Sequence, residues 1–262
     1  MPPPAAVPRA LAIVPAWNEQ DSIGATVAEI FATNPELDVL VVDDGSSDRT
    51  AQLARAAGAE VCVLPFNLGV GGAMRAGYRY ALRHGYEAAV QVDADGQHDP
   101  RYVKALLDAL DDADIVIGAR FAREGDPYRV RGPRRWAMVV LASVLSRLAG
   151  TRLTDVTSGF RAANARAIRV FAAHYPAEYL GDTVESLVIA IRTGHVVAQV
   201  PVDMRVRTGG KASASPARAA MYLVRAVVAL CLALVRRWPA TVEPSVPREQ
   251  YDASPADPGT AA

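Results

Sequence analysis

The sequence contains few cysteines and no arrangement of them that would bind a metal. Cys62 and Cys231 are the two cysteines, and both lie among apolar residues outside any Cys-x-x-Cys or Cys/His motif. We therefore expect both to be buried and reduced, as is typical of cytoplasmic proteins. The first residues also lack the long apolar segment of a secretory signal. These absences predict a protein of the cytoplasm.

The chain has no excess of charge of either sign. Its 28 lysines and arginines equal its 28 aspartates and glutamates, so the whole-chain charge does not indicate nucleic-acid binding. Hydrophobic residues make up 51% of the 262 positions and charged residues 21%, which is enough apolar material to bury a full core. One principal domain is the simplest interpretation.

Two common phosphate-binding motifs are missing. Gly69 and Gly71 begin a G-x-G-x-x-G pattern, but Met74 occupies its last position, and no G-x-x-x-x-G-K-[ST] sequence occurs. Dinucleotide and Walker-type binding are therefore not supported. The glycine-rich loop at 67–73 can still bring backbone N–H groups and a helix N-terminus near a phosphate.

The first half of the chain has the pattern of an α/β protein. Short β-branched runs alternate with longer helical patterns, which predicts a mostly parallel sheet with helices on both faces. The expected strands are residues 11–14, 39–42, 60–64, 88–92 and 115–117. The expected helices lie between the first two strands, around 73–83, and after residue 101.

The second half is less regular, and we expect it to cover the strand ends and shape a second-substrate pocket. After residue 121 come a basic loop, a helix at about 134–148, the segment 155–161, a helix at 183–193 and a strand at 196–202. The predicted organisation is a flexible N-terminus at 1–9, a domain at 10–215, an apolar and basic helix at 216–238, and a disordered tail at 239–262.

The apolar stretch at 219–235 is interrupted by Arg225 and flanked by Arg218 and by Arg236-Arg237-Trp238. A helix that crosses a bilayer needs about 20 apolar residues, so a single span is not expected. Two interpretations remain open. One is an amphipathic helix in the lipid interface, and the other is a helix packed on the domain surface.

Two carboxylates follow the strand expected at 88–92. Residues i and i+2 of a strand share one face, so Asp93 and Asp95 can hold one hard cation between them. Mg²⁺ or Mn²⁺ would take the oxygens of a diphosphate as further ligands. The alternative is an acidic turn with no metal.

Aromatic and acidic residues also follow the first two strands. Trp17 and Asp44 lie at neighbouring carboxyl ends, where open α/β folds bind nucleotides. The alternative is that Asp48 or Ser47 caps the next helix and that Asp43-Asp44-Gly45 turns the chain.

Five motifs occur in an order and spacing that resemble family 2 glycosyltransferases. They are PAWNE at 15–19, DDGSSDRT at 43–50, NLGVGGA at 67–73, DADGQH at 93–98 and DVTSGFR at 155–161. The chain is most similar to the dolichol-phosphate or polyprenyl-phosphate mannose synthase branch, over about residues 9–215. The resemblance implies the GT-A nucleotide-diphospho-sugar transferase fold.

The resemblance also implies roles for individual residues. Nucleoside contacts would come from Pro15, Trp17, Glu19 and Asp44, and the Mg²⁺ or Mn²⁺ site would be lined by Asp93, Asp95 and Gln97. Trp17 departs from the tyrosine that is usual in the family, which makes the base preference less certain. Asp93 would thus serve both the metal and the substrate.

A lipid-phosphate acceptor is already an anion, so it needs cationic ligands rather than a strong base. The resemblance places Arg120, Arg134 and Arg207 near the donor or acceptor phosphates, which suits arginine as a bidentate phosphate ligand. Lys211 extends the same basic segment. Catalytic roles are expected for Asp95, Arg120 and Arg207. For Arg129 and Arg131 we prefer a solvated surface position or a contact with membrane headgroups.

An acceptor hydroxyl would instead need a base. Asp182 or Glu185, at the start of a helix, is the candidate, and the alternative is two acids that stabilise a helix N-terminus. His98 follows the acidic run and could touch phosphate, although a lone loop histidine is more often polar surface.

The predicted function is a metal-dependent inverting transfer of a hexose, mannose or glucose, from a nucleotide diphosphate sugar to a polyprenyl phosphate. The enzyme would act at the cytoplasmic membrane face as a peripheral protein, with no nucleic-acid partner. Two alternatives are a family 2 transferase with a soluble or glycan hydroxyl acceptor, and a non-catalytic nucleotide-sugar-binding module.

Overall fold

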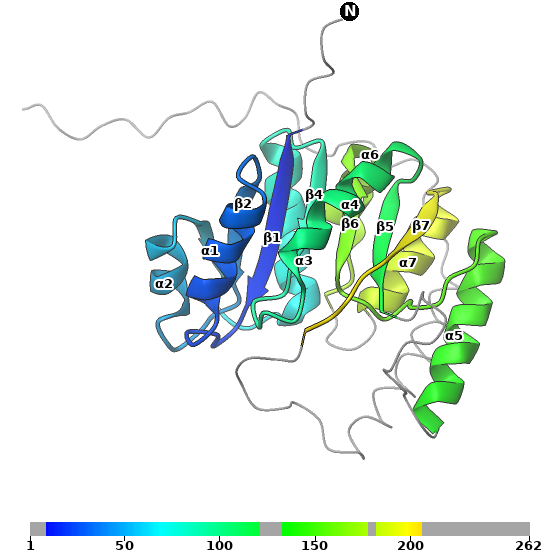
Figure 1. Ribbon diagram of the computed structural model, residues 1–262, viewed down its shortest axis with the longest axis horizontal. Coiled ribbons are helices and arrows are strands. Elements are labelled where there is room, and N and C mark those ends of the chain that lie inside the picture. The colour runs from blue at the N-terminus through cyan, green and yellow to red at the C-terminus, as the bar shows by residue number, and fades with distance from the viewer. Residues whose placement is uncertain (1–8, 121–132, 178–181, 206–262) are drawn as a thin grey trace, which may run out of the picture.

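A seven-stranded, mostly parallel sheet forms the centre of the protein in a computed structural model, which describes residues 9–120, 133–177 and 182–205 (Figure 1). The strand order is β3-β2-β1-β4-β6-β5-β7. The strands are β1 (Ala10–Ala16), β2 (Asp38–Asp43), β3 (Glu60–Val63), β4 (Ala88–Gln91), β5 (Ile115–Ala119), β6 (Arg161–Asn164) and β7 (Val197–Pro201). β6 runs antiparallel to both of its neighbours, β4 and β5.

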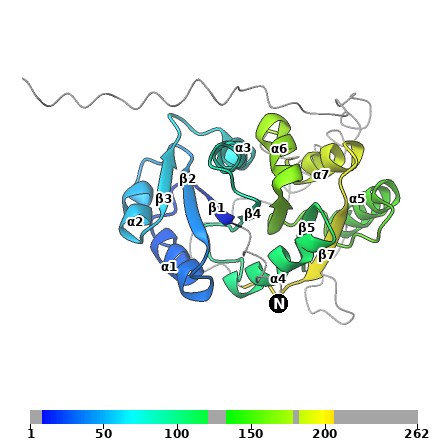
Figure 2. The same ribbon diagram turned by 90° about the horizontal axis from the view of Figure 1, so that it is seen from above.

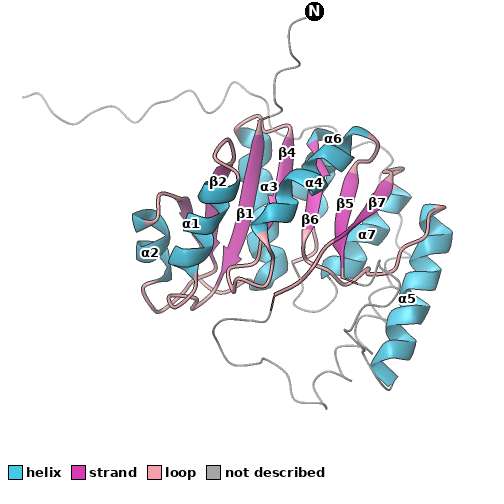
Figure 3. Cartoon of the chain, viewed as in Figure 1, coloured by secondary structure: helices cyan, strands magenta, loops and turns pink. Residues whose placement is uncertain are grey.

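Helices cover both faces of the sheet (Figures 2 and 3). On one face lie α3 (Gly69–Arg83), α6 (Ala165–His174) and α7 (Asp182–Arg192), and α5 (Pro133–Ala149) packs against α7. On the other face lie α1 (Ile23–Thr33) and α4 (Val103–Asp108), with α2 (Thr50–Ala56) beside α1. Two short 3₁₀ turns, η1 (Pro100–Tyr102) and η2 (Ala109–Asp111), flank α4. The predicted α/β class is confirmed.

Both faces of β1 are apolar and buried. Leu11 and Ile13 belong to the core beneath α3 and α6, whereas Ala12 and Val14 belong to the core beneath α1 and α4. β1 pairs in parallel with β2 on one side and with β4 on the other. A strand in this position needs apolar side chains on both faces, which explains its continuous hydrophobic sequence.

Several boundaries differ from those expected. β4 ends at Gln91, so Asp93 and Asp95 lie in the following turn rather than on one face of a strand. α3 already begins at Gly69, so most of the glycine loop is the first turn of a helix. The sequence analysis also missed β6 and α6. β6 has the sequence RAAN, which lacks the β-branched residues that predict strands.

Several predicted features fall outside the described residues. These are Arg129, Arg131, Arg207, Lys211, Cys231, the helix at 216–238 and the tail at 239–262. Within residues 9–120, 133–177 and 182–205, no helix has both the length and the apolar character needed to cross a membrane.

Candidate active site

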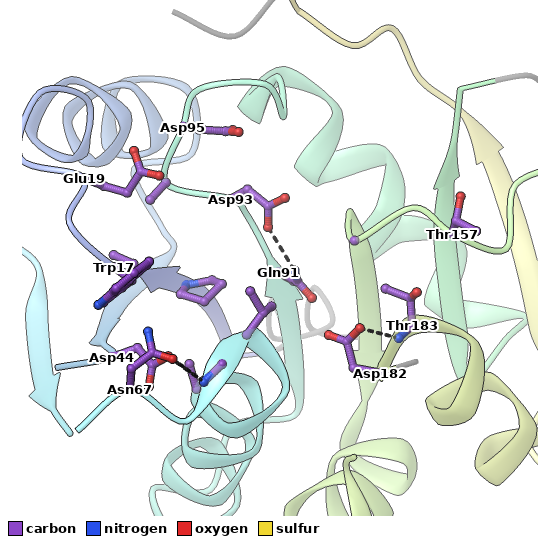
Figure 4. Close-up of a pocket in the computed structure, with 17 residues that line it drawn as sticks. Trp17, Glu19, Asp44, Asn67, Gln91, Asp93, Asp95, Thr157, Asp182 and Thr183 are labelled. Carbon is purple, nitrogen blue, oxygen red and sulfur yellow. Dashed lines mark hydrogen bonds between the residues drawn. The ribbon is translucent and has the colours of Figure 1, made fainter. Parts of the chain in front are cut away.

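A cavity of about 410 Å³ opens at the carboxyl ends of β1, β2 and β4 (Figure 4). Seven of the residues selected from the sequence line it: Pro15, Trp17, Glu19, Asp44, Asp93, Asp95 and Asp182. Three parallel strands end at this edge, and their following loops therefore meet above it. The tertiary structure brings together side chains that lie up to 167 positions apart in the sequence, from Pro15 to Asp182.

The acidic turn after β4 forms one wall of the cavity. Asp95 Oδ1 accepts a hydrogen bond from the backbone N–H of Gln97 at 3.0 Å, and Gly96 has a φ of 75° that closes the turn. Asp93 Oδ1 accepts from Gln91 Nε2 at 2.9 Å. Both carboxylates line the cavity. The prediction that they share one face of a strand is wrong, because β4 ends at Gln91.

The oxygen donors of this wall fit a hard divalent cation. Asp93 and Asp95 offer carboxylate oxygens, which Mg²⁺ and Mn²⁺ prefer. Among the described residues, no group of three or more His, Cys, Asp or Glu side chains could hold a metal. The two aspartates would therefore need oxygens from a substrate or water to complete the shell. Gln97 does not line the cavity, and its predicted role as a ligand stays a prediction.

Trp17 and Asp44 line the cavity at the strand ends where the sequence analysis expects a nucleotide. The Trp17 side chain is half exposed and lines the cavity, so its indole is accessible to a ligand. Asp44 is buried, and its two oxygens accept hydrogen bonds from the N–H groups of Leu68 at 2.7 Å and Gly69 at 2.8 Å. Burial raises the pKa of Asp44, and these two hydrogen bonds act in the opposite direction.

The contacts of Asp44 change the expectation for the glycine loop. The loop at 67–73 was interpreted as able to bring backbone N–H groups near a phosphate, but the N–H groups of Leu68 and Gly69 bind the carboxylate of Asp44. The first turn of α3 is thereby attached to the end of β2, because orphan N–H groups at a helix start need acceptors.

Asp48 joins two loops rather than facing the cavity. Its Oδ1 accepts from the N–H of Thr50 at 2.9 Å, and its Oδ2 accepts from the N–H of Gln20 at 3.2 Å. This supports the structural interpretation of Asp48 as a residue that holds the start of α2 and the loop after β1 together.

Asp182 forms part of the opposite wall, with Thr183 and Thr157 (Figure 4), and Gly159 also lines the cavity. Burial raises the pKa of Asp182, the charge of Asp93 raises it further, and the Thr183 N–H, which donates to Oδ1 at 2.9 Å, acts against this rise. Glu185, the other predicted base, lies on the same turn of α7 but does not line the cavity.

Arg120 is held by a buried carboxylate. Its Nε lies 2.6 Å from Asp155 Oδ2, and its guanidinium also donates to Asp155 Oδ1 at 2.9 Å and to Thr157 Oγ1 at 3.0 Å. Burial raises the pKa of Asp155, but the contacts with Arg120 outweigh it and the pKa is lowered. Arg120 therefore supports the loop that carries Thr157. Its predicted phosphate contact stays a prediction, as does that of Arg134, whose side chain on α5 is not described.

Two buried polar residues were given no role of their own in the sequence analysis, although Arg161 is the last residue of the DVTSGFR motif. Gln91 is buried at the end of β4 and lines the cavity. Arg161 is also buried, and it donates to the carbonyl oxygens of Val156, Ser158 and Thr183, each at 2.7 Å. The sequence did contain a signal for each residue: Gln91 interrupts an apolar strand, and Arg161 follows the apolar Phe160. A polar residue in such a position is expected to be buried with specific hydrogen-bond partners.

His98 is not the polar surface residue that was expected. Its side chain is 2% exposed, its ring stacks on Phe160 at a centroid distance of 4.7 Å, and its Nδ1 accepts from the N–H of Asp93 at 2.9 Å. Cys62 was expected to be buried and is partly exposed.

Comparison with known proteins identifies the family of this chain. The model of the family described as Glycosyl transferase family 2 matches residues 11–175. An undecaprenyl-phosphate mannosyltransferase of Micrococcus luteus is 36% identical over 215 residues, which cover 79% of this chain and 88% of that protein. A polyprenol monophosphomannose synthase of Mycolicibacterium smegmatis is 34% identical over 227 residues, covering 82% and 85%.

A solved structure is similar in fold. Glucosyl-3-phosphoglycerate synthase from Mycobacterium tuberculosis, in complex with Mn²⁺, uridine diphosphate and phosphoglyceric acid, superposes with a TM-score of 0.68. The likeness covers 86% of this chain and 78% of that one at 19% sequence identity. It confirms the expected GT-A fold.

Proposed function

The chain belongs to glycosyl transferase family 2 and is a glycosyltransferase, and from this premise we propose that it transfers a hexose from a nucleotide diphosphate sugar to a polyprenyl phosphate. Mannose and glucose are the preferred sugars in the proposal. The non-catalytic alternative is set aside, because the chain is an enzyme.

The cavity at the carboxyl ends of β1, β2 and β4 is the observation that carries the proposal. Its walls offer a half-exposed indole at Trp17, two carboxylates at Asp93 and Asp95, and a further carboxylate at Asp182. About 410 Å³ is within the usual size of a small-molecule site. A nucleoside on Trp17 would place its diphosphate beside Asp93 and Asp95.

The chemistry assigns a role to each wall. Transfer leaves negative charge on the departing diphosphate, and a divalent cation, when bound, stabilises that charge as a Lewis acid. Asp93 and Asp95 would hold this cation, and Arg120, Arg134, Arg207 and Lys211 are the proposed phosphate ligands. The acceptor phosphate is already an anion, so its attack on the sugar needs no strong base.

The relatives support the acceptor class. Two of them carry the names undecaprenyl-phosphate mannosyltransferase and polyprenol monophosphomannose synthase. We propose that this chain uses the same kind of acceptor, and that it works as a peripheral enzyme at the cytoplasmic face of a membrane.

A transfer assay tests the proposal. The protein is incubated with Mn²⁺, a polyprenyl phosphate and labelled GDP-mannose or UDP-glucose, and the butanol-extractable label is measured. We expect label in the butanol phase for the native protein and none for Asp95→Asn. Full activity of that variant would contradict the metal assignment.

A hydroxyl acceptor is the second candidate, because the Asp182 carboxylate lies at the cavity with a raised pKa. A group of this kind suits a general base. Label that remains in the aqueous phase with a sugar or glycan acceptor would favour this alternative over the lipid.

A further inference from the structure

His98 is placed to control the geometry of the acidic turn. It is five positions after Asp93, yet its Nδ1 accepts the Asp93 backbone N–H at 2.9 Å. Because Nδ1 accepts, the neutral ring carries its proton on Nε2. This Nε2 lies 3.5 Å from Asp93 Oδ2. One imidazole thus faces both the main chain and the carboxylate of the same aspartate.

The ring itself is held in place. It stacks on Phe160 with an angle of 12° between the planes, and the backbone of His98 pairs with Met204 in an antiparallel bridge. Arg205, which follows Met204, donates its backbone N–H to the backbone carbonyl oxygen of Gln97 at 3.0 Å. The imidazole is therefore a rigid support, because its position is determined by packing and by main-chain pairing.

The other side of the turn is held as well. Thr26 Oγ1 of α1 donates to the Ala94 carbonyl oxygen at 3.0 Å, and Gln91 Nε2 donates to Asp93 Oδ1 at 2.9 Å. Asp93 therefore has one carboxylate oxygen bound by Gln91 and the other next to His98. This arrangement determines the direction in which its remaining lone pairs point into the cavity.

We infer that His98 is a positioning residue, which holds Asp93 in the orientation that binds a divalent cation together with Asp95. The inference rests on the proposed function, in which these two carboxylates hold the metal. Groups that orient metal ligands from behind contribute strongly to affinity, and their loss typically weakens metal binding by roughly 10- to 100-fold.

Two substitutions separate positioning from packing. His98→Phe keeps a ring that can stack on Phe160 but removes both nitrogens. His98→Asn loses the ring but places an amide oxygen near the position of Nδ1, where it can accept the Asp93 N–H. A packing role predicts that His98→Asn is the damaged variant, whereas a positioning role predicts that His98→Phe is.

The measurement is Mn²⁺ binding, from the electron paramagnetic resonance signal of free Mn²⁺, with uridine or guanosine diphosphate present. We expect the dissociation constant to rise roughly 10- to 100-fold in His98→Phe and to stay near the native value in His98→Asn. Circular dichroism at the same temperature confirms that each variant is folded. His98→Met serves as a second variant without ring nitrogens if His98→Phe does not fold.

Each outcome has one meaning. Native Mn²⁺ affinity in folded His98→Phe or His98→Met, whatever the affinity of His98→Asn, overturns the positioning role and leaves the proposed function intact. Equal weakening in His98→Phe and His98→Asn overturns it as well, because the acceptor retained in His98→Asn then contributes nothing. Absence of Mn²⁺ binding by the native protein, with either nucleotide, contradicts the proposed function and this inference with it. Asp95→Asn is the matched control, because it removes a proposed ligand without touching His98.

Discussion

At the scale of single residues, Asp182 links the cavity to the pH dependence of stability. Its pKa is raised from the ordinary value of 3.8, chiefly by burial. The folded state therefore holds more protons than the unfolded state in the range above pH 3.8, so the free energy of unfolding falls as the pH rises through the raised pKa.

Asp182→Asn removes this titration. We compare the free energy of unfolding of the variant with that of the native protein at each pH. The difference should favour the variant more at pH 7 than at pH 4, because the native protein bears a buried charge at the higher pH. Urea unfolding at both pH values, with EDTA present, measures the difference. An equal difference at the two pH values would show that Asp182 titrates normally.

Arg120 and Asp155 form a buried ion pair with the opposite pH dependence. The Asp155 side chain has no exposed surface, and its pKa is lowered, so the pair contributes stability above pH 3.8 that is lost as the pH falls through the lowered pKa. Arg120→Met leaves the carboxylate unpaired and should cost about 3 to 5 kcal/mol.

Chemical denaturation at pH 7 tests this cost. Lys104→Met is a suitable control, since Lys104 pairs with Asp108 and both side chains are exposed. We expect a smaller loss in the control, because exposed pairs contribute about 1 kcal/mol or less. Similar losses in the two variants would refute the importance of burial for the Arg120 pair.

At the scale of elements, the start of α3 depends on Asp44. α3 has no cap from its own N-cap residue, and the carboxylate of Asp44 accepts the N–H groups of Leu68 and Gly69 instead. Asp44→Ala should therefore lower the free energy of unfolding by about 0.5 to 2 kcal/mol. Asp44→Asn retains one acceptor oxygen and should lose less. Equal losses would mean that the hydrogen bonds contribute little.

Close packing sets a second requirement on α3. A Cβ atom on Gly71 would lie 2.1 Å from the carbonyl oxygen of Pro176, whereas one on Gly24 of α1 would have no heavy atom within 4 Å. Gly71→Ala should destabilise the protein by about 1 to 3 kcal/mol. Gly24→Ala should stabilise it by up to about 1 kcal/mol, since alanine favours helix.

Thermal unfolding of the two glycine variants provides the comparison. Each adds one methyl group within a helix, so a shift of the same sign in both would show that the contact with Pro176 is relieved by a small movement. Opposite shifts are the expected result.

At the scale of the whole molecule, ligand binding should couple the two halves of the chain. The cavity is lined from the loops after β1, β2 and β4 and from the start of α7. A ligand that binds only the folded state raises its stability, by about 2.7 kcal/mol at 100 times the dissociation constant. A nucleoside diphosphate with Mn²⁺ should therefore raise the unfolding temperature.

Removal of the metal tests this prediction. EDTA should abolish the rise in unfolding temperature, and the unfolding temperature of Asp95→Asn should rise little even with Mn²⁺ present. If the nucleoside diphosphate stabilises the protein equally with EDTA, its binding does not depend on the cation.

The sequence predicted more of the sheet than of the loops. β1 was predictable because a strand buried on both faces has a continuous apolar sequence. β6 and α6 were not, because RAAN owes its place in the sheet to pairing with β4 and β5 rather than to its own propensity. The acidic turn was located correctly but for a reason that does not hold, since β4 ends before Asp93.

The sequence alone determined the fold class, the family and most of the residues around the cavity. Periodicity and short motifs consist of neighbouring residues, so both can be recognised without a structure. Only the tertiary structure decided how those residues are held. Three contacts show this: His98 with Phe160, Arg120 with Asp155, and Asp44 with the start of α3. Each contact joins residues that are far apart in the sequence. Their partners follow from packing in three dimensions, which no local pattern encodes.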